Sequence, residues 1–219
     1  MGGQGAVASG DASQFHVLQG GSTTSSDGTQ VTVAVPEADL HAIQLLTQVW
    51  ASGSTAWVRA GSGLVADMAG NAVVGTEQQA AQFIGDEVRP RIESVELDMD
   101  QGLLRVNLSE PVAVASVNAS AIVLQRAALV VAGATSLSGT DSNMSAVWGN
   151  PYLQRLSAST TVVTQSNGLS FVLALESKDV DALKVKGIGR GPGVSNTWAT
   201  AGSGLVADMA GRAVLPAVN

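Results

Sequence analysis

The amino-acid sequence predicts an all-β protein made of two modules in tandem, with one short crossover helix in each. Hydrophobic residues make up 45% of the 219-residue chain and charged residues only 13%, which suits short strands joined by many turns. Several short segments alternate between apolar and polar residues. A fourteen-residue stretch also occurs twice with one difference, as AGSGLVADMAGNAV from Ala60 and AGSGLVADMAGRAV from Ala201. The length allows two modules with a core each.

The similarity extends beyond these fourteen residues. The segment SDGTQVTVAVPEADLHAIQLL from Ser26 aligns with SNGLSFVLALESKDVDALKVK from Ser166, at an offset of 140 residues. This offset is typical of whole domains in tandem, because the units of a solenoid are much shorter. The segment that begins RPRIESVELDMD has no counterpart in the first copy. We therefore expect a partial module over residues 1–85, without its N-terminal strands, and a complete module over residues 86–219.

Each of the two aligned segments predicts a strand followed by a helix. TQVTVAV at residues 29–35 and LSFVLAL at residues 169–175 alternate in hydrophobicity after Asp-Gly or Asn-Gly, so each predicts a strand. The next segments, residues 36–49 and 176–185, have apolar residues three or four apart and predict short helices that cross between sheets. The apolar stripe of the first helix is expected to consist of Leu40, Ile43 and Leu46.

The segment without a counterpart predicts a hairpin. In SVELDMDQGLLRVNLSEPV, residues 94–112, Asp100 and Gly102 supply the turn chemistry and apolar residues alternate beyond them. The face directed to the core is expected to carry Leu104, Val106 and Leu108.

Two later strands complete the prediction. Trp57 and Trp198 occupy equivalent positions and are expected to be core aromatics. Residues 75–90 are more polar and end at a proline, so they predict the last strand of the first module and a short linker.

Charge and composition exclude several classes of protein. The formal net charge is −7 and the chain has no Lys/Arg cluster, so neither nucleic acid nor an anionic membrane surface is an expected partner. There is no cysteine and no run of about 18 apolar residues, so we expect neither disulfides nor membrane insertion. His16 and His41 are the only histidines, and no motif such as G-x-S-x-G accompanies them. We therefore expect no enzyme activity.

Several motifs together resemble a known family. SDGTQVTVAV, ADLHAIQLL, GLVADMAGNAV and RPRIESVELDMDQGLLRVNLSEPVAVASVNASAIVLQ resemble the tandem immunoglobulin-like repeats, related to SwmB-type surface repeats, of very large secreted or cell-surface proteins of algae, other protists and bacteria. The resemblance covers nearly the whole chain after about Phe15. It implies immunoglobulin-like β-sandwich modules and no catalytic residues. Arg212 departs from it, because the family usually has Asn there, as the chain has at Asn71.

Candidate site residues are of three kinds. Sequons at Asn107, Asn118 and Asn143 would accept N-glycans in a secreting eukaryote, although Asn118 also suits a turn that caps its own backbone. No cofactor is expected, but calcium is possible because it prefers carboxylate oxygens; the alternative is that each of these acids only closes its turn. Trp50 and Trp148 have no counterpart in the other module, so they are possible contacts for a neighbouring module or a glycan. The candidate metal ligands are Asp67, Asp98, Asp100 and Asp208.

These features predict an extracellular or cell-surface location and a non-enzymatic structural or adhesive role. The resemblance implies a repeat segment of a cell wall, an adhesin or a flagellar-hair-like filament, whose partners are neighbouring modules or copies of the same protein. The alternatives are a calcium- or carbohydrate-binding adhesin module and an accessory domain of an enzyme. We also expect the partial module to be completed by preceding sequence or by a strand from another subunit, because an open sheet edge captures strands.

Overall fold

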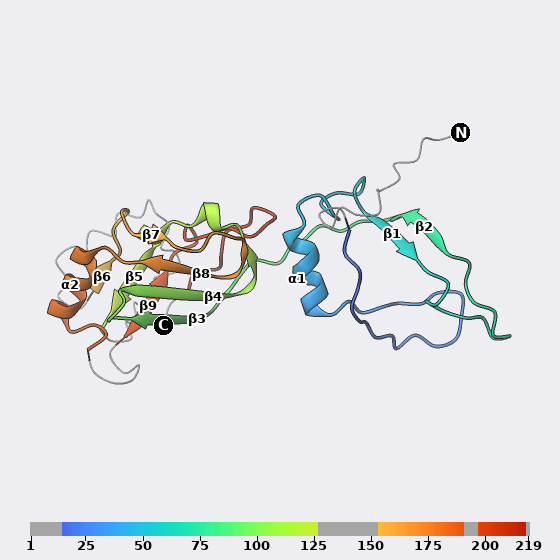
Figure 1. Ribbon diagram of the computed structural model, residues 1–219, viewed down its shortest axis with the longest axis horizontal. Helices are drawn as coiled ribbons and strands as arrows, with labels where there is room; N and C mark the ends of the chain where they lie inside the picture. The colour runs from blue at the N-terminus through green and yellow to red at the C-terminus, as the bar shows by residue number, and fades with distance from the viewer. Residues whose placement is uncertain (1–14, 127–152, 191–196, 218–219) are drawn as a thin grey trace. The chain divides into compact units, whose positions relative to one another are not determined.

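The protein consists of two compact units, which we call unit one (Met1–Glu87) and unit two (Val88–Asn219). The structure, a computed structural model, describes residues 15–126, 153–190 and 197–217 (Figure 1). These residues form antiparallel sheets and two helices, so the prediction of an all-β fold is confirmed. No helix in the described ranges is both long and apolar enough to cross a membrane.

The described part of unit two forms two antiparallel sheets. One has the strand order β3-β4-β8-β7 and the other the order β6-β5-β9. Two short 3-10 helices connect the first sheet to the second, and an α-helix, α2, follows β8. The strands are β3 (Ile92–Asp98), β4 (Leu103–Val112), β5 (Ile122–Gln125), β6 (Leu153–Arg155), β7 (Thr161–Val162), β8 (Gly168–Ala174) and β9 (Trp198–Ala201); the helices are η1 (Val114–Ser116), η2 (Ala119–Ala121) and α2 (Ser177–Lys186).

The predicted hairpin of unit two is confirmed. Strands β3 and β4 pair in antiparallel register and are joined by a turn in which Gly102 has φ 66°, a value that glycine adopts without strain. The Oδ1 atom of Asp98 closes the turn by accepting the amides of Asp100 and Gln101, at 2.9 and 2.8 Å. The predicted core face is also confirmed, because its side chains are at most 5% exposed: Leu104, Val106 and Leu108.

Most of the buried apolar residues in the described part of unit two form one hydrophobic core shared by both sheets. Phe171 and Leu173 of β8 pack in one cluster with Ile122 and Leu124 of β5. Helix α2 follows the first sheet and precedes β9 of the second, so it crosses between the sheets as predicted, and its Leu183 is fully buried. The helix ends at Gly187 in the left-handed conformation, whose amide bonds back to the last turn.

Unit one has less regular structure in its described part. It contains α1 (Glu37–Leu45), β1 (Trp57–Ala60) and β2 (Thr76–Gln79), and the two strands pair antiparallel. The predicted helix and the predicted strand within residues 75–90 are therefore confirmed. The predicted strand at residues 29–35 is wrong, because that segment forms only one β-bridge, between Ser22 and Ala34.

Very few side chains in the described part of unit one are buried. Among its described residues only Asp39 and Ala56 are buried. The apolar stripe expected on α1 is therefore wrong at Leu40, which is 47% exposed, and Trp57 is not a core aromatic, because it is 51% exposed. The physical reason is the same for both: no second sheet covers these side chains within the described part of unit one.

Candidate functional site

The acidic candidates of the sequence do not gather at one place. Asp98 and Asp100 lie at the β3–β4 turn, whereas Asp208 forms a bridge with Val112 at the other end of β4. The ten residues of β4 separate these places by about 30 Å. Asp67 belongs to unit one. The four candidates therefore do not form a single cation site.

Asp67 and Asp208 occupy the same turn in the two copies of the fourteen-residue sequence. Oδ1 of Asp67 accepts the amides of Ala69 and Asn71, at 2.9 and 2.8 Å. Oδ1 of Asp208 accepts the amides two and four residues later at 2.8 and 2.7 Å. Gly70, which precedes Asn71, has φ 86°, and Gly211, which precedes Arg212, has φ 82°. Both aspartates therefore close a turn.

Asn71 and Arg212 differ in what they offer to Oδ2, the second carboxylate oxygen of the aspartate in each turn. In unit one the side-chain Nδ2 of Asn71 donates to Oδ2 of Asp67 at 2.9 Å, and this bond is the main reason that the pKa of Asp67 is lowered. In unit two, Oδ2 of Asp208 is buried and has no hydrogen-bond partner in the described structure. The buried Glu110, which sequence reasoning missed, has a carboxylate oxygen within 4.8 Å of one on Asp208.

The two described sequons differ in their surroundings. The side-chain nitrogen of Asn107, the atom that would carry a glycan, donates to Ser94 Oγ at 2.7 Å in the middle of a strand pair. Asn118 is exposed, and its side-chain oxygen accepts the amide of Ser120 at the start of η2, so it caps its own backbone. Asn143 lies outside the described residues.

Trp50 has contacts within unit one. Its indole N–H donates to the Trp57 carbonyl at 3.1 Å, and its ring meets Phe83 edge to face with the ring centres 6.4 Å apart. The side chain is still 41% exposed. Its backbone has φ 52°, in the left-handed region. Trp148 lies outside the described residues.

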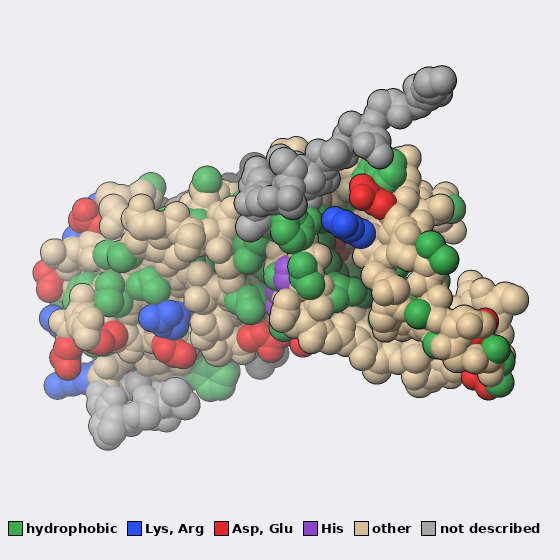
Figure 2. Space-filling model, turned by 45° about the vertical axis from the view of Figure 1, so that its right-hand side comes forward, with side chains coloured by type: hydrophobic (Ala, Val, Ile, Leu, Met, Phe, Trp, Pro, Cys, Tyr) green, Lys and Arg blue, Asp and Glu red, His purple; other side chains and the backbone are tan. Residues whose placement is uncertain are grey.

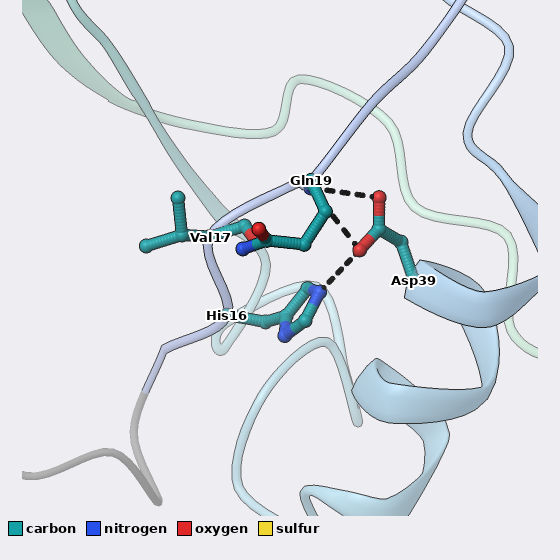
Figure 3. A network of polar contacts seen from close by, with 4 residues as sticks. All are labelled: His16, Val17, Gln19 and Asp39. Carbon is teal, nitrogen blue, oxygen red and sulfur yellow. Dashed lines mark hydrogen bonds and ion pairs between the residues drawn. The ribbon is translucent and has the colours of Figure 1, made fainter.

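A buried carboxylate, which the sequence did not indicate, fixes α1 to the segment before it (Figure 3). Asp39 lies in the first turn of α1 and is 3% exposed. Its Oδ1 contacts His16 Nε2 at 2.7 Å, and Oδ2 accepts the Gln19 amide at 3.0 Å. The bond to His16, followed by bonds to backbone amides, lowers the pKa of Asp39 below its ordinary value of 3.8, against the effect of burial.

Unit one should therefore lose stability as the pH falls below about 4. The lowered pKa means that the Asp39 carboxylate stabilises the fold above its ordinary pKa, and that this contribution disappears as the folded-state group is protonated. Asp39→Asn should lower the melting temperature of unit one at pH 6 and flatten its dependence on pH below 4. Circular dichroism melts at several pH values measure both, with the exposed Asp27→Asn as the control. An acid profile of Asp39→Asn parallel to that of the unmodified chain would contradict this role.

Unit two has a buried aspartate at the aligned position. Asp179 lies 140 residues after Asp39, in the first turn of α2, and is 2% exposed. Its Oδ2 accepts the amide and the hydroxyl of Ser157, both at 2.8 Å, and the hydroxyl of Thr160 at 3.3 Å. Its Oδ1 accepts the Gln154 side chain at 3.1 Å. Each unit thus uses this aspartate to hold the chain that lies beside its helix.

The side chains that most distinguish unit one are apolar and open to solvent. Val31, Val33 and Val35 are 48%, 42% and 43% exposed, and we call them the open strip. Figure 2 shows hydrophobic side chains on the surface of unit one. The residues 140 positions later, by contrast, are fully buried (Phe171 and Leu173) or packed against the core (Leu175).

The open strip is the candidate functional site, because neighbouring apolar side chains that are exposed together often mark a surface that binds a partner. It offers apolar side chains and a backbone edge that is unpaired within the described residues, and both are features that bind a partner strand. Comparisons with models of protein families, with curated proteins and with solved structures find no match to this chain.

Proposed function

We propose that this chain is a non-enzymatic segment of an extracellular structural or adhesive protein, built from two immunoglobulin-like β-sandwich modules in tandem. The support for tandem modules is the agreement between the units at two places far apart in the sequence. The turns at Asp67 and Asp208 share their backbone hydrogen bonds, and the helices at Asp39 and Asp179 each present a buried carboxylate. Two antiparallel sheets over one core in unit two are the arrangement that a β-sandwich requires.

The observation that carries a role in assembly is the open strip. A module that served alone would gain stability by covering Val31 and Val33, as unit two covers Phe171 and Leu173. A module in a wall, an adhesin or a filament has neighbours that cover such a face. Neighbouring modules or copies of the same protein are therefore the partners that we propose.

Glycan mapping on the natively sourced chain tests the extracellular assignment. We expect a hexose-rich mass shift that glycosidase removes, with Asn118 as the occupied site among the described sequons. Asn107 should be unoccupied, because its side-chain nitrogen is bonded to Ser94 within the sheet. Peptide mapping by mass spectrometry would locate the sites and would include Asn143. A mass equal to that of the bare sequence would remove the eukaryotic secretory route and favour a bacterial adhesin.

A calcium-binding adhesin module is the second candidate function. It is favoured by the buried Asp208 Oδ2, which has no hydrogen-bond partner in the described structure, beside the carboxylate of Glu110. Calcium at one hundred times its Kd would stabilise unit two by about 2.7 kcal/mol. Thermal melts with calcium and with a chelator measure this gain. Asp208→Asn should abolish it and Asp98→Asn should not, whereas equal melting temperatures with and without calcium would exclude this function.

A further inference from the structure

We propose that residues 29–35 of unit one accept an extended strand of the β4 type from a separate chain that carries the same kind of module. The added strand would lie beside Val31 and Val33 and cover them with alternate aliphatic side chains. The inference rests on the proposed function only in treating the two units as copies of one module.

Unit two shows which strand belongs at this place. Strand β8 pairs antiparallel with β4, and Val106 lies opposite Phe171 in the register. Leu104 lies opposite Leu173, and all four of these side chains are fully buried. The pairing with β4 therefore lies along the core positions that correspond to Val31 and Val33.

One edge of residues 29–35 is already paired, and it is the edge that β7 occupies in unit two. In unit two the Val172 amide donates to the Thr164 hydroxyl, on the β7 side of β8, at 2.9 Å. In unit one the aligned Thr32 amide donates to the Ser25 hydroxyl at 2.8 Å. The Ala34 amide donates to the Ser22 carbonyl on the same side, also at 2.8 Å. Residues 22–25 therefore take the place of β7.

The other edge is the one that β4 occupies in unit two. Backbone groups alternate in direction along an extended segment, so the amides of Val31 and Val33 point away from residues 22–25. No strand of the described part of unit one pairs with that edge. In TQVTVAV the inward-facing positions 31, 33 and 35 carry only valines, whereas many natural edge strands have an inward-pointing charge that discourages pairing. Backbone hydrogen bonds and apolar pockets together are what strand addition uses.

The probe is a peptide with the sequence of residues 91–112, which spans β3, its turn and β4. We expect saturable one-to-one binding of the labelled peptide to the full chain by fluorescence anisotropy. Hydrogen exchange followed by mass spectrometry should show protection of residues 29–35 on binding, and no change at 168–174. Protection at 168–174 instead would mean exchange into unit two and would overturn the proposal, as would the absence of binding.

Two variants of the full chain separate the core face from the outer face. Val33→Asp should weaken peptide binding at least tenfold, because the new carboxylate would face the apolar side of the added strand. Thr32→Asp places the same charge on the opposite face and should leave the affinity within about threefold. Both side chains are exposed, so the variants should fold like the unmodified chain. Equal binding by both variants would overturn the proposal, whereas the glycan test of the proposed function would be unaffected.

Discussion

Phe171→Ala should lower the free energy of unfolding of unit two by about 3–5 kcal/mol, because Phe171 is the largest fully buried side chain among the described residues. Val31→Ala, at the aligned position of unit one, should change stability by less than about 0.5 kcal/mol, because Val31 is 48% exposed. Hydrogen exchange at increasing urea concentration, read on peptides from each unit, measures both changes in the full chain.

The control for Phe171→Ala lies on the same strand. Leu169 belongs to β8 but is 42% exposed, so Leu169→Ala should cost no more than about 0.5 kcal/mol. A large cost for Val31→Ala would contradict the exposure of the open strip, because it would show that this side chain is packed against other atoms in solution.

The contrast between Phe171 and Val31 also shows what the sequence could not predict. Both residues lie in segments that alternate in the same way after a turn, so the local pattern predicts a strand for each. Only the segment around Phe171 is a strand, because β4 pairs with it along one edge and its inward side chains pack in one core with those of β5 in the second sheet. Burial of a strand depends on a partner that is distant in sequence, and periodicity carries no information about that partner.

Features whose causes are local were predicted well. The β3–β4 hairpin follows from alternation and from turn residues within a few positions of one another, and the structure places Gly102 in the left-handed conformation as such a turn needs. The two helices were predicted within a few residues for the same reason. Trp57 was predicted wrongly, because an aromatic residue suits both a core and an uncovered sheet.

The buried aspartates were missed because their partners are not near them in the sequence. Asp39 binds His16 and Gln19, more than 15 residues earlier, and Asp179 binds residues at a similar separation. An acid in the first turn of a helix is usually explained by the helix dipole. The available signal was the recurrence of an aspartate at an offset of 140 residues where both neighbours change.

Asp179→Ala should destabilise unit two by about 3 kcal/mol or more. The carboxylate accepts four hydrogen bonds, two of them from Ser157, and removing it leaves these donors without their acceptor in a buried place. Asp179→Asn should cost less than the alanine variant. It keeps one acceptor oxygen, but it turns the other position into a donor that faces donors. Thermal and urea unfolding of the two variants would give this order.

The neighbouring Asp181 provides the comparison that assigns the effect to the buried network. It lies on the same helix but is exposed, so Asp181→Ala should change the free energy of unfolding by less than about 0.5 kcal/mol. Both replacements remove one carboxylate from α2, so they change the net charge equally, although only Asp179 lies in the first turn, where the helix dipole acts most strongly. Equal losses for Asp179→Ala and Asp181→Ala would therefore mean that the loss of a negative charge, and not the loss of the buried hydrogen bonds, sets the change in stability. A large loss for Asp179→Ala alone would establish that the carboxylate holds the Ser157 segment against α2.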